Sequence, residues 1–287
     1  MGIKLFVYGT LRRGEISFDK LGQVNPLAEQ AWTQGTLFET IYDYPALRPG
    51  TDWVYGELYE ISGVALPIVD EWEGYAGDPE TDLYYREQKT IYTDRGQELA
   101  WVYFLSDYKV SILKDRIELG DFSVHRYIQR TEGPLFYFAY GSCMDHERFI
   151  QADVDHYFQR LIGQGSLEGY SLLFTAKTPA FHASDIVEVG GTVEGKVYEV
   201  PREALDYLWE REGVRIQFYR PAIVHVMVNG ESLACLTFTV INKSEEGPPS
   251  HLYGTEILRG GKTCLSEGYL RTLQKKLVDQ FSLHIEY

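Results

Sequence analysis

Two apolar segments that end in the same turn motif stand far apart in the chain. Residues 3–10 read IKLFVYGT and residues 135–142 read LFYFAYGS, so Tyr140 follows Tyr8 by 132 positions. Their aromatic and β-branched residues are typical of strands, and the glycine permits a sharp turn after each one. The pattern predicts that both segments are β-strands closed by a Tyr-Gly-Thr/Ser turn.

Three further landmarks follow each of these strands in the same order. Alternating apolar and polar positions predict strands at Trp53–Ile61 and Thr192–Val200. A short helix then opens with a proline in its first turn and ends before a glycine, with Pro67 and Gly74 in one copy and Pro201 and Gly213 in the other. Lastly, Tyr85-Arg86 is matched with Tyr219-Arg220. This repeated order, with only loop-sized differences in spacing, predicts two tandem copies of one fold.

The remaining periodic segments complete the expected architecture. β-rich stretches occupy Leu99–Leu105, Ala222–Val228 and Leu233–Val240. Apolar residues at helical spacing predict a helix from Tyr269 to Phe281, whereas the first copy ends at Ile117–Phe122 without an equally clear helix. Many strands with few long crossovers indicate an α+β fold, in which each copy is a small mixed β-barrel with peripheral helices.

A cluster of structure-breaking residues separates the two copies. It spans Thr131 to Pro134 and lies just before the second Tyr-Gly strand. The predicted domains are therefore residues 1–131 and 132–287. A chain of 287 residues is also longer than one hydrophobic core usually supports.

Charge and cysteine content narrow the classes of function. The 27 Lys and Arg against 42 Asp and Glu give a net charge of −15, which disfavours binding to nucleic acids and anionic membranes. The three cysteines form no Cys-x-x-Cys pair, so neither a disulfide framework nor a zinc knuckle is predicted. No apolar run is long enough for a signal peptide or a membrane span. We therefore expect a cytoplasmic protein without a nucleic-acid or membrane partner.

Several motifs that suggest other chemistry lack residues or spacings that this chemistry requires. Arg259–Thr263 resembles the end of a phosphate-binding loop, but Glu256 occupies the position of the first required glycine, so a turn after a helix is the preferred interpretation. No histidine spacing suits a metal, and we predict neither a metal nor a cofactor. Cys143 could face His146 or His156, but Leu11 replaces it in the first copy, so the shared chemistry cannot depend on it.

Two features recur in both copies and suggest catalysis. Successive main-chain N–H groups in the turn after the first strand can converge on an anion. Glu73 and Glu212 each end a short helix, where the helix dipole and partial burial would raise the carboxyl pKa toward the range of a general base. A tight turn remains the structural explanation of the first feature. A solvated surface glutamate is that of the second, and the recurrence weakens it.

The ordered motifs resemble the γ-glutamylcyclotransferase-like (AIG2-like) family. They are FVYGTLR (residues 6–12) with VDEWEG (69–74), and FAYGSCM (138–144) with LWEREGV (208–214). The first copy is similar to the short members of the family. The second is similar to the longer ones and shares their late PSHLYGTEI stretch at residues 249–257. Together the two resemblances extend over nearly the whole chain.

The resemblance implies a reaction and a site. The reaction is cyclisation of a small γ-glutamyl amide or peptide to 5-oxoproline, with Glu73 and Glu212 as acid and base. Main-chain amides of the two turns would hold the γ-glutamyl group, and the turns are Tyr8, Gly9, Thr10 and Leu11 and, in the second copy, Tyr140, Gly141, Ser142 and Cys143. The substrate's own α-amino group closes the ring, so the protein mainly fixes its conformation and moves protons.

The second copy departs from the family pattern at two positions. Cys143 stands where longer members usually carry Asn, and Trp209 replaces the aspartate that Asp70 supplies in the first copy. We therefore expect the first domain to be the better candidate for turnover, and Glu73→Gln to remove more 5-oxoproline release than Glu212→Gln.

Other interpretations of the chain remain open at this point. It could be a non-catalytic γ-glutamyl-binding protein with a degenerate second domain, or one domain could merely stabilise the other. Arg12, Arg86 and Arg220 could hold a substrate carboxylate or form surface ion pairs. The sequence does not identify the leaving amine or the oligomeric state.

Overall fold

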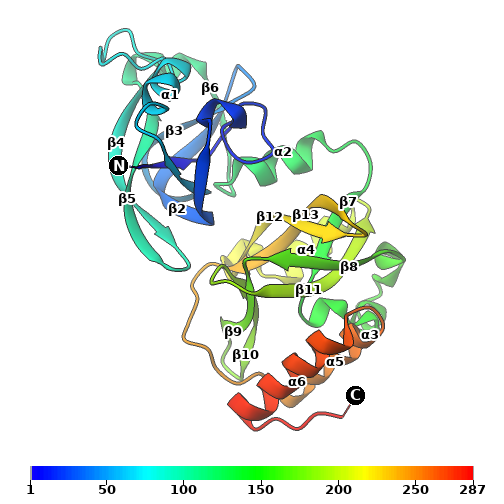
Figure 1. Ribbon diagram of the computed structural model, residues 1–287. Helices are drawn as coiled ribbons and strands as arrows, with labels where there is room; N and C mark the ends of the chain where they lie inside the picture. Colours follow the sequence, from blue (N-terminus) through cyan, green and yellow to red (C-terminus); the bar gives the residue numbers. More distant parts are fainter. Residues whose placement is uncertain (1, 287) are drawn as a thin grey trace. The chain divides into compact units, whose positions relative to one another are not determined.

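A computed structural model describes residues 2–286, which form two compact units (Figure 1). The units are Met1–Arg126 and Tyr127–Tyr287. The division falls within helix α2 (Phe122–Arg130), just before the domain boundary predicted at residues 131 and 132.

The strands of the first unit pair in a closed ring. Their order in the sheet is β3-β1-β5-β4-β2-β6, and β2 also pairs with β3, so β3, β1, β5, β4 and β2 close on one another while β6 extends from β2. The strands are β1 (Ile3–Val7), β2 (Val24–Thr40), β3 (Pro45–Ile61), β4 (Tyr84–Thr93), β5 (Gly96–Leu105) and β6 (Leu113–Arg116). The ring surrounds fully buried apolar side chains such as Phe6, Leu58 and Val102.

The second unit contains a closed barrel with the same pairing order. Its ring runs β11-β7-β13-β12-β8, which matches β3-β1-β5-β4-β2 strand for strand. The strands are β7 (Leu135–Ala139), β8 (Arg160–Glu168), β11 (Thr192–Val200), β12 (Tyr219–Val228) and β13 (Glu231–Val240). A separate antiparallel pair, β9 (Ser171–Lys177) and β10 (His182–Val187), is inserted between β8 and β11. The structure therefore confirms two tandem α+β domains of barrel type.

The predicted helices are present, with one change at a boundary. Helix α1 (Leu66–Trp72) carries Pro67 in its first turn, as predicted. Helix α4 (Ala204–Arg211) begins only after Pro201, because the Pro201 carbonyl accepts a hydrogen bond from Ala204 N–H in a preceding turn. The expectation of a proline within the first turn is therefore wrong for the second copy.

The end of the first domain differs from the sequence prediction, whereas the end of the second agrees with it. The first domain ends in the nine-residue helix α2, which the sequence pattern did not clearly indicate. The Asp121 side chain accepts hydrogen bonds from the N–H groups of Ser123 and Val124, which stabilises the start of this helix. The predicted C-terminal helix is present as α6 (Glu267–Phe281), and Ser266 caps its first turn.

The glycine pair of the rejected phosphate-binding motif lies inside a helix rather than in a turn. Helix α5 (His251–Lys262) packs beside α6, and it includes Gly260 and Gly261. A Cβ atom on Gly260 would lie 2.5 Å from the main-chain nitrogen of Asp145. Glycine at this position therefore permits the close approach of α5 to the loop after β7, and the expected turn is wrong.

Candidate active site

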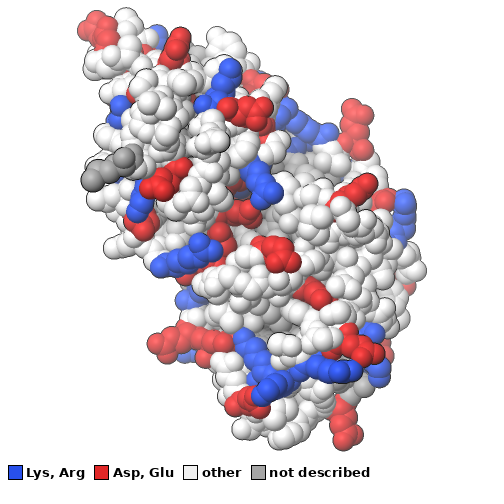
Figure 2. All heavy atoms as spheres, in the orientation of Figure 1, with Lys and Arg blue, Asp and Glu red and all other residues white. Residues whose placement is uncertain are grey.

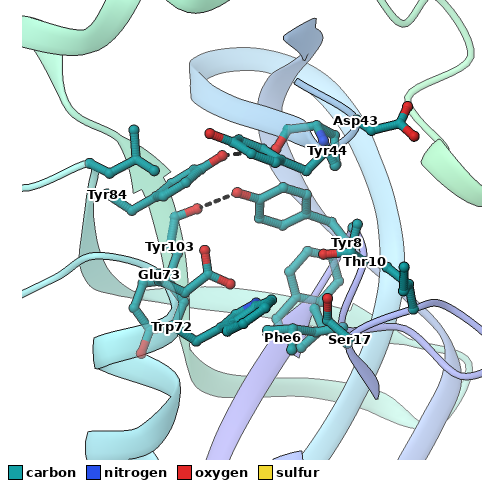
Figure 3. A pocket seen from close by; sticks show the side chains of 16 residues that line it. Phe6, Tyr8, Thr10, Ser17, Asp43, Tyr44, Trp72, Glu73, Tyr84 and Tyr103 are labelled. Carbon is teal, nitrogen blue, oxygen red and sulfur yellow. Dashed lines mark hydrogen bonds between the residues drawn. The ribbon is translucent and has the colours of Figure 1, made fainter. Parts of the chain in front are cut away.

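A cavity of about 280 Å³ opens where β1 ends in the first domain (Figure 3). The turn after β1, the end of α1 and residues of β4 and β5 form its walls. Its lining residues include Tyr8, Gly9, Thr10, Leu11, Ile16, Asp43, Tyr44, Pro45, Trp72, Glu73, Tyr84 and Tyr103. This first pocket thus brings together every site residue predicted for the first domain.

Glycine allows the turn after β1 to form one wall of the first pocket. A Cβ atom on Gly9 would lie 2.7 Å from Pro45 Cγ, so only glycine lets the turn approach that loop so closely. No acceptor within residues 2–286 receives a hydrogen bond from the N–H groups of Gly9, Thr10 or Leu11. These donors are therefore available to an anionic or carbonyl group of a ligand.

Glu73 is the C-cap of α1, and its carboxylate points into the first pocket (Figure 3). Gly74, with φ 65°, reverses the chain immediately after it. In the part of the chain that the structure describes, no hydrogen bond or ion pair reaches the Glu73 carboxylate. Burial without a compensating partner raises the pKa of Glu73 from 4.5 to about 7. At neutral pH the group therefore populates both protonation states.

This raised pKa has a consequence for stability. The unfolded chain loses the proton near pH 4.5 and the folded chain near pH 7. The contribution of protonated Glu73 is therefore fully present below about pH 4.5 and is lost as the pH rises through about 7. Glutamine cannot ionise, so we expect the Tm difference between Glu73→Gln and wild type to be more positive at pH 8 than at pH 5. An equal difference at both pH values, measured by thermal unfolding, would show that the carboxyl pKa is not raised.

A polar network ties α1 to the barrel beside Glu73. Asp70 lies one turn before Glu73 and accepts hydrogen bonds from Arg86 Nε at 2.7 Å and from the Tyr103 hydroxyl at 2.6 Å. Arg86 and Tyr103 face each other on β4 and β5. In addition, the Tyr8 hydroxyl donates to the Tyr103 carbonyl at 2.9 Å. The network fixes the helix end from which Glu73 enters the first pocket.

A second pocket, of about 160 Å³, occupies the equivalent place in the second domain. Its lining residues include Tyr140, Gly141, Ser142, Cys143, Arg148, Ala183, Ser184, Arg211, Glu212, Tyr219, Phe238 and Tyr253. All five residues predicted for this site are present. A Cβ atom on Gly141 would lie 2.2 Å from Ser184 Oγ, so glycine again permits a close approach.

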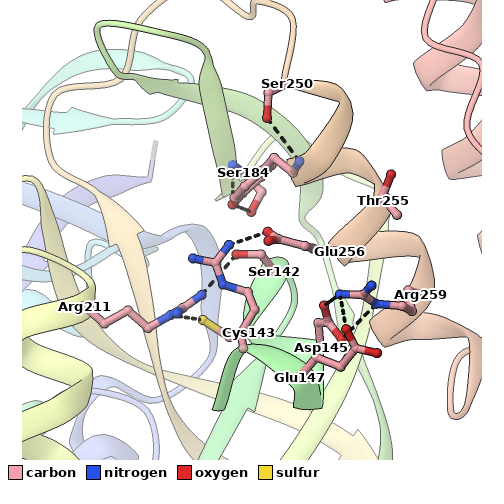
Figure 4. A network of polar contacts seen from close by, with 12 residues as sticks. Ser142, Cys143, Asp145, Glu147, Ser184, Arg211, Ser250, Thr255, Glu256 and Arg259 are labelled. Carbon is pink, nitrogen blue, oxygen red and sulfur yellow. Dashed lines mark hydrogen bonds and ion pairs between the residues drawn. The ribbon is translucent and has the colours of Figure 1, made fainter. Parts of the chain in front are cut away.

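Glu212 differs from Glu73 in its surroundings. It is likewise the C-cap of its helix and precedes a left-handed glycine, Gly213. However, the Cys143 thiol donates to Glu212 Oε1 at 3.1 Å, and Arg211 Nε lies 3.4 Å from the same oxygen. Arg211 Nε also donates to Cys143 Sγ at 3.0 Å (Figure 4). Burial raises the pKa of Glu212, while Arg211 and the Cys143 hydrogen bond oppose the rise. Cys143 therefore contacts the predicted base, whereas neither His146 nor His156 lines the second pocket.

Each pocket contains an equivalent tyrosine, whose hydroxyl binds a main-chain carbonyl of another lining residue. The Tyr84 hydroxyl donates to the Pro45 carbonyl, and the Tyr219 hydroxyl donates to the Ser184 carbonyl. The strand registers agree, because Tyr84 pairs with Leu105 and Tyr219 with Val240. Tyr219 therefore corresponds to Tyr84, and the sequence match of Tyr85-Arg86 to Tyr219-Arg220 is wrong by one residue. Such a slip exchanges the two faces of a strand.

With the register corrected, the replacement of Asp70 by Trp209 belongs to a set of three changes. Arg86 corresponds to Pro221 and Tyr103 to Phe238, and Pro221 and Phe238 again face each other on neighbouring strands. Trp209 packs edge-on against Phe238 with ring centroids 5.5 Å apart. Apolar packing in the second domain thus takes the place of the Asp70 hydrogen bonds of the first, whereas the tyrosine hydrogen bond recurs, from the Tyr140 hydroxyl to the Phe238 carbonyl.

The three arginines considered for substrate binding serve other contacts. Arg12 is 3% exposed and pairs with Glu57 and Asp121, and Arg86 pairs with Asp70. Arg220 is buried and donates to the Pro221 carbonyl. None of them lines either pocket.

Sequence reasoning missed lining residues that are not shared between the two copies. Tyr44 and Trp72 line only the first pocket, and Arg148, Arg211 and Tyr253 line only the second. A signal was present for one pair of them, because Trp72 and Arg211 each directly precede the recurring glutamate. The two arginines of the second pocket each form an ion pair. Arg148 pairs with Glu256, and Arg211 pairs with Glu212.

Two features of the described residues bear on other functions. Residues 2–286 contain no cluster of three or more His, Cys, Asp or Glu side chains arranged to hold a metal ion. None of their helices combines the length and the apolar character needed to cross a bilayer. On the face shown in Figure 2, Lys and Arg are interspersed with Asp and Glu and form no single basic patch.

Comparisons with known proteins agree with this geometry. The family described as "Gamma-glutamyl cyclotransferase, AIG2-like" matches residues 5–124, and "AIG2-like family" matches residues 192–273. A Bacillus subtilis (strain 168) protein named "Putative gamma-glutamylcyclotransferase YkqA" is 39% identical over 282 residues, which cover 96% of this chain and 98% of the relative. The crystal structure of Bacillus subtilis YkqA matches with a TM-score of 0.88 and 37% identity, over 97% of this chain and 98% of that chain.

A further relative matches part of the chain only. The γ-L-glutamyl-butirosin B γ-glutamyl cyclotransferase of Niallia circulans is 37% identical over 100 residues, which cover 34% of this chain and 64% of the relative. The full-length match to YkqA, the two family matches and the repeated barrel lead to one assignment. The chain belongs to the AIG2-like γ-glutamylcyclotransferase family, as a tandem-domain member of the YkqA type.

Proposed function

We propose that the protein cyclises a γ-glutamyl amide to 5-oxoproline and releases the free amine. The observation that carries the proposal is the position of Glu73, which has no bonding partner among the described residues and lies beside a turn whose N–H groups are free. The family membership supports the same reaction, as does the Niallia circulans relative, whose name gives γ-L-glutamyl-butirosin B as the compound it acts on.

The chemistry requires only groups that line the first pocket. The α-nitrogen of the substrate attacks the γ-carbonyl carbon, a C–N bond closes the five-membered ring, and the bond to the leaving nitrogen breaks. The α-nitrogen loses two protons and the leaving nitrogen gains two, so a carboxylate that accepts and returns protons is regenerated. In this account Glu73 performs that transfer, and the N–H groups of Gly9 to Leu11 stabilise the negative charge on the substrate.

The proposal gives a definite pH dependence. Glu73 must be ionised to accept the first proton, and burial raises its pKa to about 7. We therefore expect kcat/KM for 5-oxoproline release to rise with pH through about 7 and to level off above it. A rate that does not change between pH 5 and pH 8 would contradict the assignment of Glu73 as the base.

The direct test uses the full chain and three compounds: γ-glutamyl-ethylamide, γ-glutamyl-alanine and glutathione. We expect 5-oxoproline from at least one of them, measured by chromatography against a reaction without protein. A chain that only binds these compounds would show a higher Tm without product. That outcome would favour the alternative of a non-catalytic binding protein.

A further inference from the structure

Ser17 is a buried serine whose side chain faces the first pocket. It is 5% exposed and belongs to the lining, and Figure 3 shows its hydroxyl directed into the cavity. The residue lies just before the short 3-10 helix η1 (Phe18–Leu21), a position at which a serine hydroxyl commonly accepts a hydrogen bond from a main-chain N–H group. The Ser17 hydroxyl forms no such bond. Within residues 2–286 it has no other hydrogen-bond partner, so it is available to a ligand.

Thr10 supplies a second free hydroxyl to the same pocket. The Ser17 N–H group donates to the Thr10 carbonyl at 3.0 Å, which holds the two lining residues together. The Thr10 hydroxyl has no hydrogen-bond partner in the part of the chain that the structure describes. In the second domain the equivalent residue is Ser142, and its hydroxyl accepts a hydrogen bond from Arg211 at 3.2 Å. The first domain thus leaves free a hydroxyl that is occupied in the second.

Most tyrosine hydroxyls of the first pocket are already used by the protein. Among the described lining residues, three of four tyrosine hydroxyls donate to protein acceptors, and these belong to Tyr8, Tyr84 and Tyr103. Tyr44, the fourth, is only partly buried, and Figure 3 shows it on the opposite side of the cavity from Ser17. Thr10 and Ser17 therefore supply the free hydroxyls on the side of the turn after β1.

Under the proposed function, the first pocket binds an anionic group without a cation of its own. Every γ-glutamyl compound carries an α-carboxylate, and no Lys or Arg is among the described residues that line this pocket. In the second domain, the segment after the turn forms α3 (His146–Gln151) and brings Arg148 to the second pocket. The matching segment of the first domain brings Ser17. Hydroxyl groups can take the place of a cation here, because a carboxylate accepts about four hydrogen bonds.

The other polar atoms of the γ-glutamyl group already have partners in the proposed reaction. Glu73 exchanges protons with the α-nitrogen, and the N–H groups of Gly9 to Leu11 face the charge that develops on the γ-carbonyl. The α-carboxylate is bonded to the same carbon as the α-nitrogen, so it enters the cavity together with the group that Glu73 contacts. Ser17 lines that cavity with Glu73, and its free hydroxyl matches the one polar group that still lacks a partner.

We propose that the Ser17 hydroxyl, together with that of Thr10, binds the α-carboxylate of the γ-glutamyl group in the first pocket. The inference rests on the proposed function and deepens it, because it assigns the anionic group of the substrate to named side chains. The α-carboxylate keeps its charge throughout ring closure, so the contact is equally strong in the substrate complex and in the transition state. Its loss should therefore raise KM and leave kcat nearly unchanged.

Two ring compounds that differ only in the carboxylate test the proposal, and these are 5-oxoproline and 2-pyrrolidinone. Each is used to inhibit ethylamine release from γ-glutamyl-ethylamide by the full-length Glu212→Gln chain, in which the first domain retains its glutamate. We expect Ser17→Ala to weaken inhibition by 5-oxoproline about 10-fold, the effect of losing a hydrogen bond to a charged group. Inhibition by 2-pyrrolidinone should change less than about twofold, because the lost contact involves only the carboxylate.

Ser62→Ala is the matched control, because Ser62 is an exposed serine of the same domain and is not a lining residue. Thr10→Val removes the other hydroxyl while it keeps the shape of the side chain, and it should weaken 5-oxoproline in the same selective way. Thermal unfolding verifies that each variant is folded. If Ser17→Ala does not fold, Thr10→Val carries the same comparison.

The proposal holds if Ser17→Ala weakens inhibition by 5-oxoproline selectively and Ser62→Ala weakens neither compound. It is overturned if Ser17→Ala leaves inhibition by 5-oxoproline unchanged. It is also overturned if both compounds are weakened equally, since the hydroxyl would then contact the ring and not the carboxylate.

A separate measurement distinguishes failure of this proposal from failure of the proposed function. If the Glu212→Gln chain releases no ethylamine, the proposed function fails for the first domain, and calorimetric titration of the full chain with the same two compounds decides. Ser17→Ala leaves the second pocket unaltered, so a changed Kd belongs to the first. Binding of 5-oxoproline that is about 10-fold weaker, with 2-pyrrolidinone unaffected, supports the carboxylate site. Absent or unchanged binding of 5-oxoproline refutes it.

Discussion

Glu73→Gln is expected to reduce 5-oxoproline release from γ-glutamyl-ethylamide by about 10²- to 10⁴-fold, the usual contribution of a general acid–base group. Glu212→Gln is expected to change it little. Glutamine keeps the shape of the side chain but cannot accept a proton. The measurement is kcat/KM of the full-length variants at pH 8.

The structural reason is the difference between the two carboxylates. Glu73 has no bonding partner among the described residues, and its pKa is raised to about 7, so it can both accept and return a proton near neutral pH. One Glu212 oxygen already accepts a hydrogen bond from the Cys143 thiol and lies near Arg211. A larger loss with Glu212→Gln than with Glu73→Gln, on this compound, would refute the ranking.

Arg12→Met is expected to destabilise the first domain by about 3–5 kcal/mol, because it leaves two buried carboxylates without their cation. Arg12 donates to Glu57 at 3.1 Å and to Asp121 at 2.7 Å, and all three residues are less than a tenth exposed. Asp121 also caps α2, so its displacement would affect the end of the domain. Unfolding in urea, followed by tryptophan fluorescence, reports mainly on this domain, which holds four of the five tryptophans.

Arg13→Met provides the neighbouring control. Arg13 pairs with Glu29, but its side chain is 52% exposed, and exposed pairs of this kind contribute about 0–1 kcal/mol. We expect its unfolding curve to lie close to that of the wild type. If the two variants were equally stable, the buried ion pairs of Arg12 would not be what holds the turn after β1 to the barrel.

The sequence identified the parts of the site that recur within the chain. Glu73, Glu212 and the two Tyr-Gly turns stood out because each occurs twice at matching places, and the structure brings each glutamate and its turn into one pocket. Repetition cannot reveal residues that differ between the copies. Trp72 and Arg211 therefore escaped notice, although they occupy the same position and each lines its pocket.

The errors in the sequence analysis have physical causes. Tyr85 was matched to Tyr219 because each precedes an arginine, but the alternation of side chains along a strand, visible only once the register is known, selects Tyr84. Gly260 suggested a turn, yet it lies within α5, where the absence of a side chain permits the close approach of the Asp145 main chain. The raised pKa of Glu73 was predicted from the helix dipole and partial burial, and burial is the cause in the structure.

The central claim is that the two glutamates carry the protons of the cyclisation. The most direct measurement is 5-oxoproline release from a mixture of γ-glutamyl-ethylamide and γ-glutamyl-alanine by the full-length Glu73→Gln/Glu212→Gln chain at pH 8. With thermal unfolding to verify that the variant is folded and an active wild-type chain as the reference, the account predicts no release above the rate without protein. Release at the wild-type rate would contradict it.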